Sequence, residues 1–364
     1  MIKFSASVGS RGLPTSITSE DDLDILIDAL KQDVEKLKFW QFYVVDLVQG
    51  REDVKGALAD NNIVKWTGPE VRGRSAIDLA VTLHEQNLVR NISILGPRFN
   101  RSIDPAVSAG LLKAAYPGVT NNDQLADNWV QIVKIINIPL SEEWNSDTKI
   151  AFDNIRGRAK YNRLDLGGPK LGPLSAEQPI AEQYFTRIPE NERTAKFNKL
   201  ELAVANNGWI WDADPLINFA TNSSKAYIQR QVIAWGDCVK LRFGAGPQDS
   251  PWLWQWMTDY VAELASTFDG FRLDNCHSTP LHVGVAMLDA ARSINPNLYV
   301  CAELFTGSSE TDLYFVSRLG INSLIREASN GYDPKEFSRL IYSYAVNKPI
   351  GKCNASQNRI AHAN

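Results

Sequence analysis

Between residues 250 and 327, stretches with helical and strand periodicity alternate along the chain, and this alternation constrains the fold more than any other feature. Helices are expected over 250–266, 279–296 and 310–319, and strands over 270–274, 298–304 and 321–327. Strands separated by helices form βαβ units, in which the strands are parallel. Repeated three times, the pattern predicts a parallel sheet or a (β/α) barrel.

The first half of the chain is predicted to be mainly helical. An amphipathic helix is expected to start at Ser19, a serine N-cap followed by acidic residues, and to run through SEDDLDILIDALKQDVEKLKFW. Shorter helices are expected around Ala76–Leu88 and Leu125–Ile136, before a loop-rich stretch over 163–179.

Two carboxylates lie where predicted strands end. In GFRLD (270–274) successive side chains alternate, so Arg272 and Asp274 share one face, with Asp274 at the C-terminal end. Glu303 lies near the same end of the next strand. In parallel α/β barrels the active site forms at this rim, because the βα loops converge there.

Such a pair suits retaining glycoside chemistry, which uses two carboxyl groups roughly 5–5.5 Å apart as nucleophile and acid/base. Arg272 favours an ionised Asp274 as the nucleophile, whereas Glu303, among less polar neighbours over 301–305, can stay protonated as the acid. The spacing alone is equally consistent with an ordinary Arg272–Asp274 ion pair and a solvated Glu303.

The segments DGFRLDNCHSTP (269–280) and YVCAELFTGS (299–308) resemble the nucleophile and acid/base regions of the α-amylase family, in the form typical of glycogen debranching enzymes. Further segments are similar to debranching-enzyme sequences: NNGWIWDADP (206–215), WGDCVKLRFG (235–244) and RLGINSLIREA (318–328). The best match covers about 183–331. The resemblance implies an α/β fold, with an incomplete (β/α)8 TIM barrel of the α-amylase type over 183–364 after a largely helical insert over 1–182.

The resemblance also implies roles for individual residues. Asp274 is the expected nucleophile, Glu303 the general acid and then base, and Arg272 the residue that orients Asp274. His277 and Phe305 are candidate contacts of the acceptor sugar, and Phe305 can stack on a glucose ring. Asn275, next to the nucleophile, is a further substrate-binding candidate.

Aromatic side chains suit either a core or a sugar surface. Trp209 and Trp211 lie in a loop-like segment beside acidic residues and are candidate sugar platforms. Trp252 and Trp256, four residues apart on a predicted helix, are expected to pack in the core. His84 and His282 lie on predicted helices and are expected to be structural.

By resemblance, the expected activity is that of a 4-α-glucanotransferase, which moves maltooligosaccharide stubs in glycogen breakdown by a retaining double displacement. Glycogen, limit dextrin and maltooligosaccharides are the expected partners, and the chemistry requires neither metal nor organic cofactor. Two alternatives remain open: a catalytically inactive α-glucan-binding fragment, and an α-glucan hydrolase of the amylase family.

The family pattern also includes an Asp-x-x-x-Asn-His region on an earlier strand and a later His-Asp pair that supplies a third carboxylate. Neither occurs in this sequence, although RIAHAN (359–364) resembles the start of the strand that leads to the His-Asp pair. We therefore expect an internal piece of a longer debranching enzyme, without its 1,6-glucosidase half and with little activity alone.

Composition narrows the remaining function classes. The net charge of −4 and the absence of a long basic run argue against a nucleic-acid partner. Neither a signal peptide nor a stretch of about 20 apolar residues that could cross a membrane is evident. Isolated cysteines, Cys276 and Cys301 among them, argue against zinc and are expected to be reduced thiols of a cytoplasmic protein.

Overall fold

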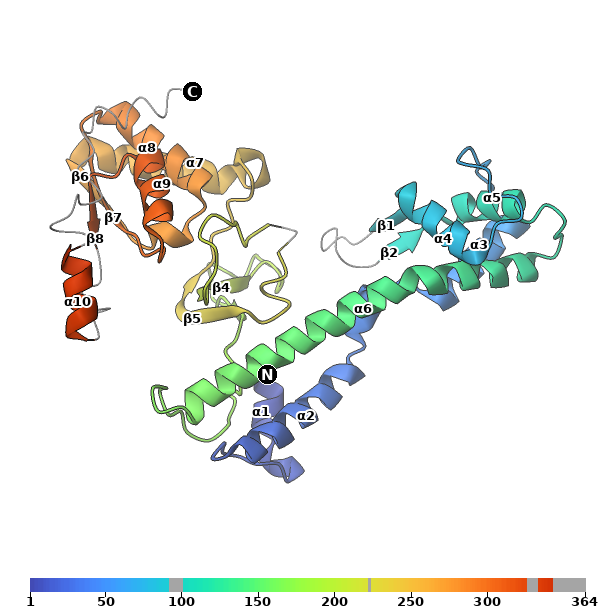
Figure 1. The fold of residues 1–364 in the computed structure, drawn as a ribbon, viewed down its shortest axis with the longest axis horizontal. Helices are drawn as coiled ribbons and strands as arrows, with labels where there is room; N and C mark the ends of the chain where they lie inside the picture. The colour runs from blue at the N-terminus through green and yellow to red at the C-terminus, as the bar shows by residue number, and fades with distance from the viewer. Residues whose placement is uncertain (92–100, 222–223, 326–332, 343–364) are drawn as a thin grey trace. The chain divides into compact units, whose positions relative to one another are not determined.

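The computed structural model describes residues 1–91, 101–221, 224–325 and 333–342 (Figure 1). The chain divides into two compact units, one formed by 1–199 with 225–236 and the other by 200–224 with 237–364. Strand β5 (Val232–Val239) includes the third junction between them, at 236/237. None of the helices in the described ranges is both long enough and apolar enough for a membrane span.

The first unit is mostly helical, as expected for this part of the chain. Its elements are α1 (Ile2–Ser7), α2 (Glu20–Lys36), α3 (Leu47–Ala59), α4 (Ala76–Glu85), β1 (Val89–Asn91), β2 (Arg101–Ile103), α5 (Pro105–Ala115), α6 (Asn122–Arg163) and β3 (Phe185–Arg187). Strands β1 and β2 pair antiparallel.

Local sequence explains where α2 and α4 begin. The hydroxyl of Ser19 accepts the backbone N–H of Asp22, and the Asp22 carboxylate accepts the N–H of Ser19, which forms a capping box. Ser75 and Asp78 make the same box at the start of α4. Both predicted helices are therefore confirmed, and α2 ends at Lys36, a few residues earlier than its sequence suggested.

Helix α6 is much longer than the predicted helix over Leu125–Ile136, because it continues to Arg163 with Pro139 in its interior. A proline removes one helical hydrogen bond, which made a stop near this position the simpler expectation. Both halves of α6 are held by tertiary packing, so the helix runs through the proline. The loop-rich stretch predicted over 163–179 begins where α6 ends.

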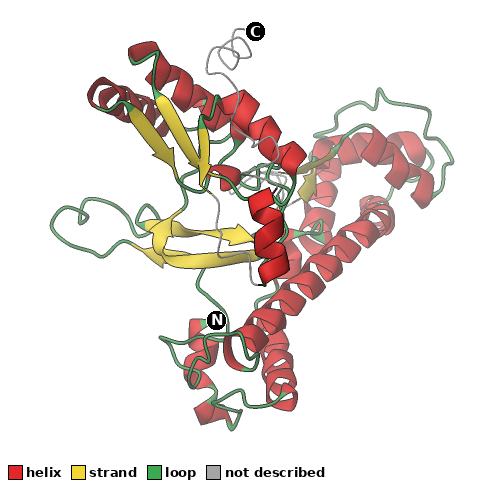
Figure 2. Ribbon diagram, turned by 60° about the vertical axis from the view of Figure 1, so that its left-hand side comes forward, coloured by secondary structure: helices red, strands yellow, loops and turns green. Residues whose placement is uncertain are grey.

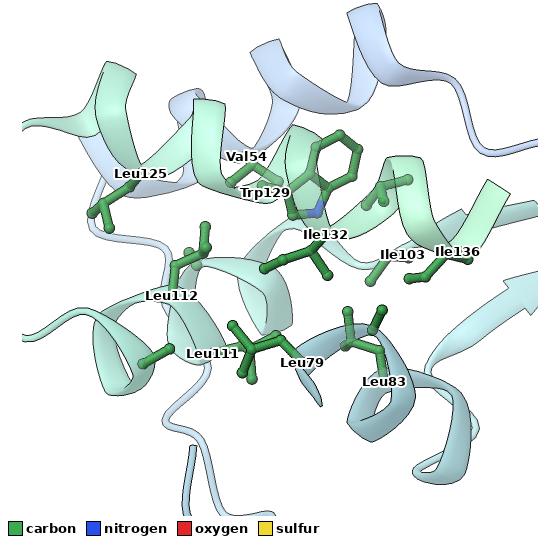
Figure 3. Packing of buried hydrophobic residues seen from close by; sticks show 14 of the residues in the cluster. Val54, Leu79, Leu83, Ile103, Leu111, Leu112, Leu125, Trp129, Ile132 and Ile136 are labelled. Carbon is green, nitrogen blue, oxygen red and sulfur yellow. The ribbon is translucent and has the colours of Figure 1, made fainter. Parts of the chain in front are cut away.

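The two halves of α6 belong to different hydrophobic clusters. Near its N-terminus, Leu125, Trp129 and Ile132 are fully buried against α3, α4 and α5. Figure 3 shows this packing, with α6 side chains directed toward those of the other helices. Near its C-terminus, Phe152 and Ile155 pack against α1 and α2. The first unit thus has two cores connected by one helix.

Buried polar groups lie on α6 between the cores. Asn137 exchanges two hydrogen bonds of 2.9 Å with the backbone of Val45. Asp147, only 2% exposed, accepts hydrogen bonds from Tyr43, Lys225 and Gln229. These last two contacts attach the segment 225–236 to the rest of the first unit.

A glycine on α5 gives a direct test of packing in the first core. A methyl group on Gly110 would overlap the backbone carbonyl oxygen of Val64, whereas Gly157, exposed on α6, has no described neighbour within 4 Å of that position. We expect Gly110→Ala to lower the unfolding free energy by about 3 kcal/mol through overpacking. Gly157→Ala should raise it by about 0.5–1 kcal/mol through helix propensity. Urea unfolding of both variants measures this, and equal effects would contradict the described packing.

The second unit contains β4 (Ala203–Ile210), α7 (Pro251–Thr267), β6 (Gly270–Leu273), α8 (Leu281–Ile294), β7 (Tyr299–Glu303), α9 (Ser309–Leu319), β8 (Ser323–Ile325) and α10 (Pro334–Ile341). Strands β6, β7 and β8 form a parallel sheet in this order, with Arg272 opposite Cys301 and Cys301 opposite Ser323. A separate sheet has the order β3-β4-β5. The predicted βαβ units and the α/β class are confirmed, while the closed barrel stays a prediction.

The two faces of the β6-β7-β8 sheet differ in chemistry. One face packs on helices α7, α8 and α9 through side chains such as Phe271, Val300 and Ala302. Figure 2 shows these strands beside their helices. The alternating residues, among them Arg272, Cys301 and Glu303, are exposed or half-buried on the opposite face. Period-two alternation therefore directs the polar residues away from the helices.

Some predicted features fall on residues that the structure does not describe. The predicted strand over 321–327 is observed as Ser323–Ile325, and residues 326 and 327 lie outside the described ranges. The segment 359–364 and Cys353 also lie outside them.

Candidate active site

Asp274 directly follows β6, at the C-terminal edge of the parallel sheet. The Arg272 Nε donates to the Asp274 Oδ1 at 2.6 Å, and the two side chains are 60% and 67% exposed. An exposed ion pair of this kind adds little to folding stability, typically about 0–1 kcal/mol. Its evident effect is to restrict the orientation of the Asp274 carboxylate.

Glu303 is the last residue of β7, the strand beside β6. The backbone N–H of Asn275 donates to the Glu303 Oε2 at 2.9 Å. The amide nitrogen of Asn275 is bonded to the carbonyl carbon of Asp274, so this hydrogen bond connects Glu303 to the peptide unit that carries Asp274. Both carboxylates therefore lie at C-terminal strand ends on one edge of the sheet, as predicted.

His277 and Phe305 form a second contact between the same strand ends. His277 lies in the short 3-10 turn Cys276–Ser278 after β6, and Phe305 follows β7. The Phe305 N–H donates to His277 Nδ1 at 3.4 Å, and the two ring centroids are 5.4 Å apart. An imidazole nitrogen that accepts is unprotonated, so a neutral His277 carries its proton on Nε2.

Trp209 and Trp211 form a separate aromatic pair. Their ring centroids are 5.6 Å apart at an interplanar angle of 49°, and Trp211 is 77% exposed. The predicted loop is wrong for Trp209, because β4 extends to Ile210 and the chain turns only at Asp212, where φ is 53°. The two rings therefore lie side by side where β4 ends.

The prediction that Trp252 and Trp256 pack in the core is wrong. They are 71% and 59% exposed and stack on each other, with ring centroids 5.5 Å apart. Trp254 is the buried tryptophan of α7, and its Nε1 donates to the carbonyl oxygen of Phe243 at 2.8 Å. Spacing by four residues shows that two side chains share a helix face, but not which face is buried.

His282, on α8, agrees with its predicted structural role. His282 Nε2 lies 3.0 Å from the Gly244 carbonyl oxygen, which attaches the loop before α7 to helix α8. Within the described ranges, no group of three or more His, Cys, Asp or Glu side chains is arranged to hold a metal ion.

Cys276 and Cys301 are unpaired thiols, as predicted, and differ in their surroundings. Cys276 is buried in the core between sheet and helices, and this burial raises the pKa of its thiol to about 12, from a usual 9.0. The thiolate is the reactive form. At pH 8 we therefore expect iodoacetamide to modify Cys276 on the order of 10³-fold more slowly than an ordinary exposed thiol.

Peptide mass spectrometry after timed labelling at pH 8 gives both rates. Half-buried Cys301, on the opposite face of the sheet, serves as the internal comparison and should react faster than Cys276. Because the raised pKa keeps Cys276 protonated, its labelling rate should keep rising up to about pH 12. Equal labelling of the two thiols in the folded chain at pH 8 would contradict the buried position.

Comparison with known proteins agrees with the sequence resemblance. Residues 1–299 match a family model described as the glucanotransferase domain of glycogen debranching enzyme. A glycogen debranching enzyme of Saccharomyces cerevisiae is 41% identical over 356 residues, which cover 96% of this chain and 23% of the yeast protein. The chain thus spans about a quarter of the length of this curated relative. The family match contains Asp274 and ends before Glu303.

Proposed function

The chain belongs to the family of the glycogen debranching enzyme glucanotransferase domain, and we propose that it carries the nucleophile and the acid/base of a 4-α-glucanotransferase. The observation that carries this proposal is the hydrogen bond from the Asn275 N–H to Glu303, which links the end of β7 to the residue that follows Asp274 at one sheet edge. A pair in this arrangement supports retaining glycosyl transfer.

The proposed reaction has two displacements at the anomeric carbon. Asp274 attacks that carbon and forms a β-glucosyl ester, while Glu303 donates a proton to the departing glycosidic oxygen. Glu303 then removes a proton from the 4-hydroxyl of an acceptor glucan, which attacks the ester and restores the α-linkage. Arg272, 2.6 Å from Asp274, orients the nucleophile.

The remaining site residues have supporting roles in the proposal. His277 and Phe305, in contact at the same sheet edge, are placed to meet the acceptor sugar. The exposed Trp209–Trp211 pair supplies aromatic faces for glucose units. The substrates are glycogen, limit dextrin and maltooligosaccharides, and the reaction needs neither metal nor organic cofactor.

The proposal extends to the complete fold of the domain and to the cellular compartment of the protein. The parallel order β6-β7-β8, with helices on one face, supports a (β/α)8 barrel of the α-amylase type. The unpaired thiols of Cys276 and Cys301 support a reducing compartment such as the cytoplasm.

Because the chain matches about a quarter of the yeast relative, the test uses that relative with its matching segment replaced by this chain. We expect this chimera to convert maltopentaose into both longer and shorter oligosaccharides. Resistance to trypsin and urea unfolding, compared with the unmodified yeast protein, report whether the replaced segment of the chimera has folded. A folded chimera without transfer would contradict the proposal.

The same experiment separates the two alternatives. A hydrolase would release only shorter products with new reducing ends. An inactive glucan-binding protein would be retained on immobilised glycogen but would leave the chain-length distribution of maltopentaose unchanged.

A further inference from the structure

Asn275 has a backbone conformation that few residue types adopt. Its φ of 49° and ψ of 40° lie in the left-handed region, between the end of β6 and the 3-10 turn Cys276–Ser278. A side chain with a branched Cβ is strongly disfavoured there, whereas glycine adopts the conformation freely and asparagine tolerates it. The structure therefore depends on the residue type at this position.

Both polar groups of the Asn275 backbone are engaged. Its N–H donates to Glu303 at 2.9 Å, and its carbonyl oxygen accepts the N–H of Ser278 at 2.9 Å and the hydroxyl of Thr279 at 3.4 Å. The contacts of the carbonyl hold the turn on one side of the residue. The amide on the other side is directed across the sheet edge to Glu303.

This geometry connects the Glu303 carboxylate to the peptide unit of Asp274 through a single residue. The φ angle of Asn275 sets the direction of its amide relative to the fixed turn, and the same peptide unit holds Asp274. A change of φ would separate the amide from Glu303 and leave that carboxylate without this donor. The Phe305–His277 hydrogen bond joins the same strand ends but does not involve Glu303.

We propose that Asn275 is a positioning residue, whose left-handed backbone directs its amide to Glu303 and thereby sets the spacing between acid/base and nucleophile. The role of Asn275 in catalysis rests on the proposed function. The contact between its amide and Glu303 is independent of that function, because the contact can be observed without turnover.

The contact is tested by NMR on the 364-residue chain. Asparagine, or the amino acid that replaces it at position 275, is labelled with 15N at its backbone nitrogen, and aspartate is labelled with 13C at its carbonyl carbon. Only the amides of labelled residues that directly follow an aspartate, residue 275 among them, then appear in the spectrum. We expect the amide proton signal of residue 275 to move as the pH is lowered through carboxylate protonation. Glu303→Gln should remove the part of this movement that depends on Glu303, since a neutral amide does not titrate, and should leave the part that comes from Asp274 on the same peptide unit.

Two substitutions distinguish the effect of the backbone conformation of residue 275 from the effect of its side chain. Asn275→Gly retains access to the left-handed region and should keep the Glu303-dependent part of the movement, whereas Asn275→Val should lose that part. Asn61→Val is the matched control, because Asn61 is another exposed asparagine with positive φ, 51°, and lies in the first unit. It introduces the same strain elsewhere and should leave the signal of residue 275 unchanged.

The catalytic role is tested in the chimera with the yeast relative. Asn275→Val should lower kcat on the order of 10²-fold with KM nearly unchanged, the scale expected when a catalytic group is misplaced by about 1 Å. Asn275→Gly, which keeps the backbone conformation and removes only the side chain, should lower kcat much less than Asn275→Val does. If glycine and valine lowered kcat equally, or if the valine variant retained the Glu303-dependent part of the amide movement, the inference would be overturned.

Discussion

Replacement of Asp274 by asparagine is expected to abolish glucan transfer, with a loss of at least about 10⁴-fold, the scale on which removal of a covalent nucleophile acts. The substitution retains the shape of the side chain but removes the charge that forms the ester and pairs with Arg272. Product formation from maltopentaose by the chimera with the yeast relative measures this loss.

Asp269→Asn is the matched control, because it changes the same residue type immediately before β6, at the opposite end of the strand from Asp274. This variant should transfer glucan at close to the wild-type rate.

Asp274→Gly adds a positive test. With an α-glycosyl fluoride as donor, external azide should restore cleavage and yield the β-glycosyl azide, since a single displacement inverts the anomeric carbon. Significant transfer by Asp274→Asn would show that another group is the nucleophile.

Glu303→Gln is expected to lower transfer from maltopentaose by about 10²–10⁴-fold, the usual contribution of a general acid/base. The loss should be smaller with an α-glycosyl fluoride, because fluoride leaves without protonation. Glutamine keeps an oxygen that can accept the Asn275 N–H, so the substitution removes the proton transfer with little change to the contact. Initial rates with the two donors measure the difference.

Azide also distinguishes this variant from the nucleophile variant. In Glu303→Gln, azide attacks the ester on Asp274, so two displacements give the α-glycosyl azide rather than the β-product. Glu310→Gln, exposed in the first turn of α9, is the control and should behave as wild type. An equal loss with both donors would argue against a general-acid role for Glu303.

The sequence predicted the α7–β8 region well because local signals and tertiary structure agree there. Pro251 marks the first turn of α7, and alternation in GFRLD separates the core-facing Phe271 and Leu273 from Arg272 and Asp274. Because β6 and β7 are parallel neighbours, their C-terminal ends lie at one edge of the sheet, and Asp274 and Glu303 lie there with them. The order of helices and strands in the sequence is enough to predict this.

Elsewhere the outcome depended on tertiary contacts that sequence spacing does not reveal. The helix predicted around Leu125–Ile136 did not end there, because packing on both sides of Pro139 holds α6 in one helix. The exposure of Trp252 and Trp256 depends on which face of α7 meets the sheet. The hydrogen bond from Asn275 to Glu303 requires both the strand register and a positive φ, although asparagine after a strand is one available indication of such a turn.

Helix α6 also determines how the first unit should open. At 42 residues it is roughly 63 Å long, so its ends lie too far apart to share one core. Since Pro139 lacks an amide hydrogen and lies between the two clusters, the ladder of hydrogen bonds is interrupted near the point where the packing partners change. Hydrogen exchange should therefore divide α6 into two cooperative units, one protected with Trp129 and the other with Phe152, each of which can open while the other remains closed.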